Sequence, residues 1–306
     1  MPKYPIHKDF LIERIINPPM GRIFFRSGNL FLNSLPKWAG LRDGVTITPE
    51  VIPDSADSQG PSGWTIHPLA AGAAGAAERC ILFIHGGGFV MKGGPYHYRL
   101  ARDYATGTGC DVFYVDYRLA QDTPYGVPLS DCLNAYEMLC GRYSNVSVVG
   151  DSAGGFLALK VAMEARRRPD CLCLIYPVVD CSMRTASMAE FTDTPVWNSA
   201  CNRKMWLYYL QGHEEQSILD ADLSGFPPTL VQTAEFDCLR DEGILLHERL
   251  SAQGVSTILD QTSGTVHGFD VIRRSRITRD AISRRIAFLS SFNLESRSPP
   301  ARPQDP

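Results

Sequence analysis

The chain has 306 residues, of which 44% are hydrophobic, and its formal net charge at pH 7 is −3. This length suits one domain with an insertion and allows a large core. A slightly negative chain lacks the electrostatic attraction on which nucleic-acid and anionic-lipid binders depend. Its nine cysteines are odd in number and scattered. We therefore expect buried thiols, a cytoplasmic protein and no metal site.

Apolar stretches alternate with helix-like stretches through most of the chain. We expect strands near residues 45–53, 63–69, 80–85, 111–117, 146–151, 171–176, 229–236 and 256–260. We expect helices near residues 96–106, 126–142, 153–167, 240–253 and 270–290. This alternation predicts an α/β fold with a mostly parallel central sheet and helices on both faces.

Two segments fall outside this alternation. Residues 1–41 are rich in aliphatic and aromatic side chains, and residues 178–225 form a long connection that contains several aromatic residues, among them Trp197, Trp206 and Tyr209. A connection of that length without structure is uncommon in a compact domain, so we predict that the two segments form a helical cap.

The catalytic core is then expected to comprise residues 42–177 and, continued after the cap insertion, residues 226–293. Residues 294–306 are rich in Pro, Ser and Arg, and we expect them to be disordered.

Residues 150–155 read G-D-S-A-G-G and join an apolar strand to a helix-like stretch. Glycines two residues either side of Ser152 allow a turn tight enough to hold the serine in a strained conformation, with its hydroxyl exposed above the sheet. Alone, G-x-S-x-G is equally typical of an ordinary turn.

A second signal lies about sixty residues earlier, where residues 85–89 read H-G-G-G-F after an apolar strand. Backbone amides in such a glycine loop can converge on the oxyanion of a tetrahedral intermediate. A phosphate loop is the alternative, but the sequence that follows has no immediate helix and no G-K-[S/T]. His85, at the end of the strand, suits a role in holding the loop through backbone bonds.

An acid and a histidine follow the turn at residues 150–155, which we call the elbow. The strand 229–236 ends at Asp237, and residues 267–269 read H-G-F. Either residue alone is more often structural, as a helix cap or a surface or core histidine. In the order Ser152, Asp237, His267 they predict a serine triad. Asp241 is a rival acid, although the first turn of the following helix is an ordinary place for a carboxylate.

The chain resembles the hormone-sensitive-lipase-like group of α/β-hydrolases, whose bacterial members are mostly carboxylesterases. The blocks that carry the likeness are residues 85–89, 116–120 (D-Y-R-L-A), 150–155, 237–243 and 267–269. The resemblance implies an α/β-hydrolase fold with Ser152 as nucleophile, His267 as general base and Asp237 as its orienting acid. It also implies an oxyanion hole, formed by the amides of Gly87, Gly88 and Ala153.

The chain departs from the family pattern at two places. After D-Y-R-L-A the family usually continues P-E-H-P-F-P, whereas residues 121–128 read Q-D-T-P-Y-G-V-P. Cys238 also stands where a proline is common. We expect a rebuilt turn before the next helix and an intact triad.

These observations favour a serine carboxylesterase that hydrolyses short-chain acyl esters, from about acetyl to hexanoyl, through an acyl-enzyme and without a cofactor. An amidase of the arylformamidase type would use the same triad, and a non-catalytic ligand receptor is the alternative from another class. The expected partner is a small-molecule ester, with neither nucleic acid nor membrane, and the choice between monomer and homodimer stays open.

Overall fold

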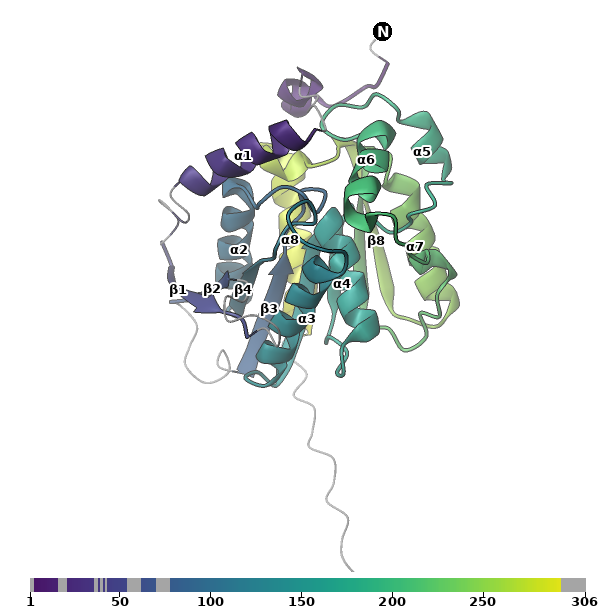
Figure 1. The fold of residues 1–306 in the computed structure, drawn as a ribbon. Coiled ribbons are helices and arrows are strands. Elements are labelled where there is room, and N and C mark those ends of the chain that lie inside the picture. Colours follow the sequence, from purple (N-terminus) through teal and green to yellow (C-terminus); the bar gives the residue numbers. More distant parts are fainter. Residues whose placement is uncertain are drawn as a thin grey trace, which may run out of the picture.

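The computed structural model describes residues 3–15, 21–35, 38, 41, 43–53, 62–69 and 78–292 (Figure 1). The disorder predicted for residues 294–306 lies outside this part of the chain. No helix among the described residues has both the length and the apolar composition needed to cross a membrane.

One eight-stranded sheet organises the molecule. Its strands are β1 (Val45–Val51), β2 (Ser62–Pro68), β3 (Arg79–Ile84), β4 (Asp111–Asp116), β5 (Asn145–Asp151), β6 (Leu172–Ile175), β7 (Thr229–Phe236) and β8 (Thr257–Val266). They stand in the order β1-β2-β4-β3-β5-β6-β7-β8. β2 is antiparallel to both of its neighbours, and all the other pairs are parallel. The predicted mostly parallel sheet is confirmed.

The register of the central strands brings distant motifs to one edge. Ile84 at the end of β3 pairs with Gly150 of β5, and Asp151 pairs with Ile175 of β6. Because parallel strands end at the same edge of a sheet, the glycine loop after β3 and the elbow after β5 leave the sheet side by side.

The longer helices are α1 (Arg22–Ser34), α2 (Pro95–Thr108), α3 (Val127–Cys140), α4 (Ala153–Glu164), α6 (Ser199–Leu210), α7 (Arg240–Ala252) and α8 (Arg276–Ser291). Shorter ones are η1 (Lys8–Ile15), α5 (Ala186–Glu190), η3 (Ile218–Asp220) and η4 (Phe269–Val271). Figure 1 shows α3 and α4 in front of the sheet and α8 behind it. Helices therefore cover both faces, as predicted.

Two predicted boundaries differ from the structure by more than three residues. The last helix starts at Arg276 rather than near residue 270, because η4 and a turn intervene. The last strand extends to Val266 rather than residue 260. Its added residues are mostly polar, and much of this edge strand is accessible to solvent. A polar, half-exposed strand lacks the apolar run on which the prediction depended.

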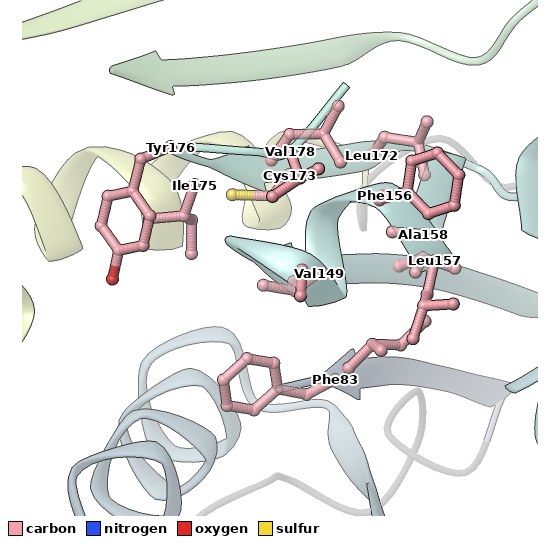
Figure 2. Packing of buried hydrophobic residues seen from close by; sticks show 14 of the residues in the cluster. Phe83, Val149, Phe156, Leu157, Ala158, Leu172, Cys173, Ile175, Tyr176 and Val178 are labelled. Carbon is pink, nitrogen blue, oxygen red and sulfur yellow. The ribbon is translucent and has the colours of Figure 1, made fainter. Parts of the chain in front are cut away.

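The hydrophobic core lies between the sheet and these helices. Figure 2 shows side chains of β6, including Leu172, Cys173 and Ile175, packed beside Val149 of β5 and near Phe156 of α4. All nine cysteines lie in the described part of the chain, seven of them are buried, and none forms a disulfide. This core fixes the strand ends from which the site is built.

The segments before β1 and between β6 and β7 meet at one end of the molecule. α1 lies beside α6 (Figure 1), and the ring centroids of Phe25 in α1 and Tyr208 in α6 are 5.4 Å apart. Lys3 Nζ and Tyr4 Oη also reach the carboxylate of Asp193 in the later segment, each at 2.5 Å.

Candidate active site

Ser152 occupies a strained turn between β5 and α4. Its φ of +54° and ψ of −121° lie outside the ordinary regions for a residue with a side chain. The flanking glycines are sterically required, since a Cβ on Gly150 would stand 2.3 Å from the carbonyl oxygen of Gly154. A Cβ on Gly154 would stand 2.1 Å from the carbonyl oxygen of Ile84. The turn therefore holds the hydroxyl of Ser152 at the edge of the sheet.

The three residues predicted for the triad lie together. Ser152 Oγ is 2.8 Å from His267 Nε2, and His267 Nδ1 is 2.7 Å from Asp237 Oδ2. Asp237 is fully buried, and its other oxygen accepts a hydrogen bond of 3.0 Å from the amide of Leu239. The carboxylate therefore requires the proton of the neutral imidazole on Nδ1, which leaves Nε2 as an acceptor facing the serine hydroxyl.

The rival acid lies elsewhere. Asp241 accepts a hydrogen bond of 2.7 Å from the amide of Ser187 and pairs with the guanidinium of Arg240 at 2.8 Å. The bond with Ser187 joins α7 to the start of α5, and Asp237 is the carboxylate in contact with His267.

The glycine loop after β3 faces the serine. Gly87 and Gly88 have φ values of +111° and +60°, which favour glycine, and both line the same cavity as Ser152. The amides of Gly87, Gly88 and Ala153 donate no hydrogen bond to another described residue. Ala153 begins α4 and does not line the cavity, but its amide belongs to the electropositive N-terminus of that helix.

His85 supports the glycine loop from below. Its Nδ1 donates to the carbonyl oxygen of Gly86 over 2.6 Å, and its ring stacks on Tyr117 with 4.4 Å between centroids. Burial, together with the nearby His97, lowers the pKa of His85 to about 3. The ring is therefore neutral at physiological pH, and its proton is committed to the loop.

A second pair of an acid and a histidine lies behind the elbow. Asp151 accepts from the amide of Gly86 at 3.0 Å and lies 3.2 Å from His97 Nε2. His97 Nδ1 accepts from the amide of Gly94, so its proton faces Asp151. Burial alone would raise the pKa of the Asp151 carboxyl, but His97 and the Gly86 amide hold that pKa below its usual value. The buried carboxylate thus ties the glycine loop to the elbow.

The cavity at Ser152 measures about 220 Å³. It is lined by Gly87, Gly88, Tyr96, Asp151, Ser152, Tyr176, Val196, Trp197, His267, Gly268 and Val271. Of the three cap aromatics named from the sequence, Trp197 alone is among these residues. Trp206 and Tyr209 instead pack against Phe89 and Phe156, which do not line the cavity.

Several lining residues were not singled out from the sequence. The ring of Tyr176 lies 4.6 Å from that of His267, and Val196 and Val271 add apolar walls. Tyr176 directly follows a buried strand that ends at the site edge, and that position was the available signal. Val196 and Val271 follow turns with no pattern in the sequence to mark them.

The loop that carries His267 is anchored by a buried ion pair. Asp270, in η4 just after His267, contacts Arg285 of α8 at 2.6 Å, and both side chains are fully buried. Gln232 and Tyr104 complete the hydrogen bonds of the guanidinium. A group of His, Cys, Asp or Glu side chains able to hold a metal ion is not found among the described residues.

Comparison with known proteins places this geometry in context. Residues 81–271 match the family model described as alpha/beta hydrolase fold. Carboxylesterase NlhH of Mycobacterium tuberculosis is 34% identical over 210 residues, which cover 62% of this chain and 66% of that protein. The chain therefore matches slightly less than two thirds of the length of this relative.

Solved structures resemble nearly the whole chain. Esterase LipW from Mycobacterium marinum superimposes with a TM-score of 0.86, covering 95% of this chain and 97% of that one at 23% identity, and so shares the fold. A structure titled Bacterial Heroin Esterase superimposes with a TM-score of 0.81 at 26% identity, covering 95% of this chain and 99% of that one.

Proposed function

The chain belongs to the α/β-hydrolase fold family, in agreement with its resemblance to the hormone-sensitive-lipase-like group, and from this premise we propose that it is a serine carboxylesterase for short-chain acyl esters. The observation that carries the proposal is the hydrogen-bonded series Ser152, His267, Asp237 opening into a small cavity beside the glycine loop. Relatives named as a carboxylesterase and an esterase support the reaction class.

In the proposed reaction Ser152 Oγ attacks the ester carbonyl while His267 Nε2 takes its proton. Asp237 keeps the imidazole in the required tautomer and stabilises the imidazolium. The amides of Gly87, Gly88 and Ala153 receive the developing oxyanion. His267 then protonates the leaving alcohol, and a water molecule, activated in the same way, hydrolyses the acyl-enzyme.

We also propose that residues 1–41 and 178–225 act as the cap over a core of residues 42–177 and 226–293. The contacts of Lys3 and Tyr4 with Asp193, and the packing of α1 beside α6, support a cap formed by both segments together. Trp197 brings the later segment directly to the cavity.

The size of the cavity supports the short-chain preference. Its 220 Å³ lie below the roughly 300–1,000 Å³ of pockets for drug-sized ligands. A methylene buried in open space gains about 0.8 kcal/mol, whereas one forced into filled space costs roughly 1–3 kcal/mol. Trp197 limits the space, because a Cβ on Gly88 would meet its ring at 3.0 Å.

The test is a series of p-nitrophenyl esters from acetyl to decanoyl, with an aryl formamide alongside. We expect kcat/KM to peak between acetyl and hexanoyl and to fall at least about tenfold by decanoyl, a difference of roughly 1.4 kcal/mol. Trp197→Ala should move the optimum to longer chains, while Trp206→Ala, a change outside the cavity lining, should not. A decanoyl optimum, or faster turnover of the formamide, would overturn the proposal.

A further inference from the structure

The far end of the glycine loop is held by a residue of the N-terminal helix. Asn29 of α1 is buried, with 7% of its surface exposed. Its Nδ2 donates to the carbonyl oxygen of Val90 over 2.8 Å, and its Oδ1 accepts from the amide of Lys92 over 2.8 Å. α1 also approaches the loop closely, since a Cβ on Gly28 would lie 2.9 Å from Met91 Cε.

Rigid peptide units relate these two hydrogen bonds to the part of the loop that faces Ser152. A trans peptide is planar, and its C=O and N–H point in opposite directions, so a group that fixes the carbonyl of one residue also orients the N–H of the next. The carbonyl of Val90 and the amide of Met91 belong to one such unit. While Asn29 holds that carbonyl, the Met91 amide donates to the carbonyl oxygen of Gly87 over 2.9 Å.

The same relation between carbonyl and N–H holds in the peptide unit that joins Gly87 to Gly88. The carbonyl of Gly87 shares its peptide unit with the amide of Gly88, and it also accepts from the amide of Val90 at 3.2 Å. With that carbonyl directed into the turn, the Gly88 N–H points away from it. Gly88 lines the cavity that contains Ser152, and its amide donates to no other described residue.

We propose that Asn29 is a positioning residue for the oxyanion hole, acting through the 90–91 and 87–88 peptide units on the amide of Gly88. The inference rests on the proposed serine-esterase function. Every hydrogen bond in the series runs in the same direction, from Asn29 to Val90, from Met91 to Gly87 and from Gly88 to the oxyanion. Each bond therefore polarises the next, in addition to fixing its direction.

A purely structural role for Asn29 would be to attach α1, and it predicts different consequences. Lys92 holds the same end of the loop to the core, with its Nζ 2.9 Å from the Asp116 carboxylate and 3.2 Å from the carbonyl oxygen of Tyr117. Loss of α1 packing would change the melting temperature and KM. Loss of the aligned Gly88 amide would lower kcat, because the amide acts on the charge that develops in the transition state.

The test compares Asn29→Asp with Asn33→Asp, the same change at an exposed position of the same helix. Asn29→Asp keeps an acceptor for Lys92 but removes the donor to Val90. Deleting a direct oxyanion donor costs about 10²–10³ in kcat, so we expect roughly a tenfold loss for this indirect contact, with KM within about twofold. Affinity for a trifluoromethyl ketone, whose serine adduct carries an oxyanion, should fall by a similar factor. Asn33→Asp should match the wild type in all three.

If the Asn29→Asp variant does not fold, the test uses Asn29→Leu, which removes both hydrogen bonds without adding charge. It should lower kcat by at least as much. An unchanged kcat in a folded Asn29 variant, or a change confined to KM and melting temperature, would overturn the positioning role while the esterase function stands. Absence of ester turnover in the wild type would overturn the proposed function, and this role with it.

Discussion

The two walls of the cavity at Ser152 are held in place by different means. At the elbow, backbone atoms approach so closely that Gly150 and Gly154 have no room for a Cβ. The opposite wall, the glycine loop, is held mainly by hydrogen bonds with the side chains of His85 at its own start, Asn29 of α1 and Asp151 at the end of β5. A Cβ on Gly87 would also lie close, 2.6 Å from the carbonyl oxygen of Met91, but the directions of the loop amides depend on these polar contacts, whereas the elbow depends on steric exclusion.

This difference has a consequence for each wall. Steric exclusion is all-or-none, since a backbone carbonyl 2 Å from an added atom cannot move aside without unfolding the turn. The effect of losing a directed hydrogen bond is graded, because the loss changes the orientation and polarity of an amide while the loop keeps its path. Substitutions at the elbow should therefore damage folding and activity together, and substitutions behind the loop should reduce kcat selectively.

The largest effect among the residues that support the nucleophile is expected at Asp237. Asp237→Asn should lower kcat by about 10⁴, because the amide favours the wrong tautomer of His267. Asp241→Asn is the matched control, since this carboxylate contacts Ser187 and Arg240 instead, and it should cost less than about tenfold. Steady-state kinetics on one ester distinguishes the two. A reversed result would move the acid to Asp241.

The steric wall is tested next by Gly154→Ala. The new Cβ would lie 2.1 Å from the carbonyl oxygen of Ile84 and 2.7 Å from that of His85. Overpacking typically costs about 1–3 kcal/mol, and backbone neighbours place this site at or above the upper end. The free energy of unfolding, measured with urea, and the activity should fall together. Gly141→Ala, with its Cβ at an ordinary 3.5 Å contact, should change neither by much. Equal stability of the two variants would refute the steric account.

The polar wall is tested by His85→Phe. Phenylalanine keeps the stacking on Tyr117 but removes the hydrogen bond to the carbonyl of Gly86, whose peptide unit also carries the Gly87 amide. We expect kcat to fall by about tenfold, roughly 1.4 kcal/mol in the transition state, with little change in KM. A change in KM alone would show that this bond does not orient the amide.

The smallest effect on kcat is expected in the loop behind the elbow, where the change is in stability. Glu242 is fully buried and accepts from the amides of Val179 and Asp180, while Val178 donates to the carbonyl of Ser152. Burial raises the pKa of Glu242 to about 8 from an ordinary 4.5. The folded state therefore binds an extra proton between these pH values, and stability falls as pH rises through this range.

Glu242→Gln removes that proton linkage and keeps an acceptor for both amides. Relative to wild type, the variant should gain stability from pH 5 to pH 8, by up to about 1.4 kcal/mol per pH unit. Urea unfolding at the two pH values measures the difference. Parallel pH dependence in the two proteins would contradict a protonated Glu242.

The elbow could be predicted from the sequence because its serine and glycines lie within six consecutive residues, although the carbonyl that excludes a Cβ at Gly154 belongs to Ile84 of β3. The mostly parallel sheet could be predicted for a similar reason, because apolar stretches and helix-like stretches alternate along the sequence. Asn29 could not be predicted, since it lies about sixty residues before the loop it contacts and its helix has no family motif. Trp197 was one of three candidate aromatics, and only the packing of α6 against Phe89 and Phe156 separates it from Trp206 and Tyr209.

The central claim is that Ser152 is the nucleophile of an esterase, and covalent labelling tests it most directly. The protein would be treated with a fluorophosphonate, and peptide mass spectrometry would locate and count the adduct. We predict one adduct per chain, on Ser152, together with loss of ester turnover. Ser152→Ala should take no label and lose roughly four to six orders of magnitude in kcat while remaining folded, whereas Ser130→Ala, at an exposed serine of α3, should behave as wild type. A label on another residue, or turnover retained in Ser152→Ala, would contradict the account.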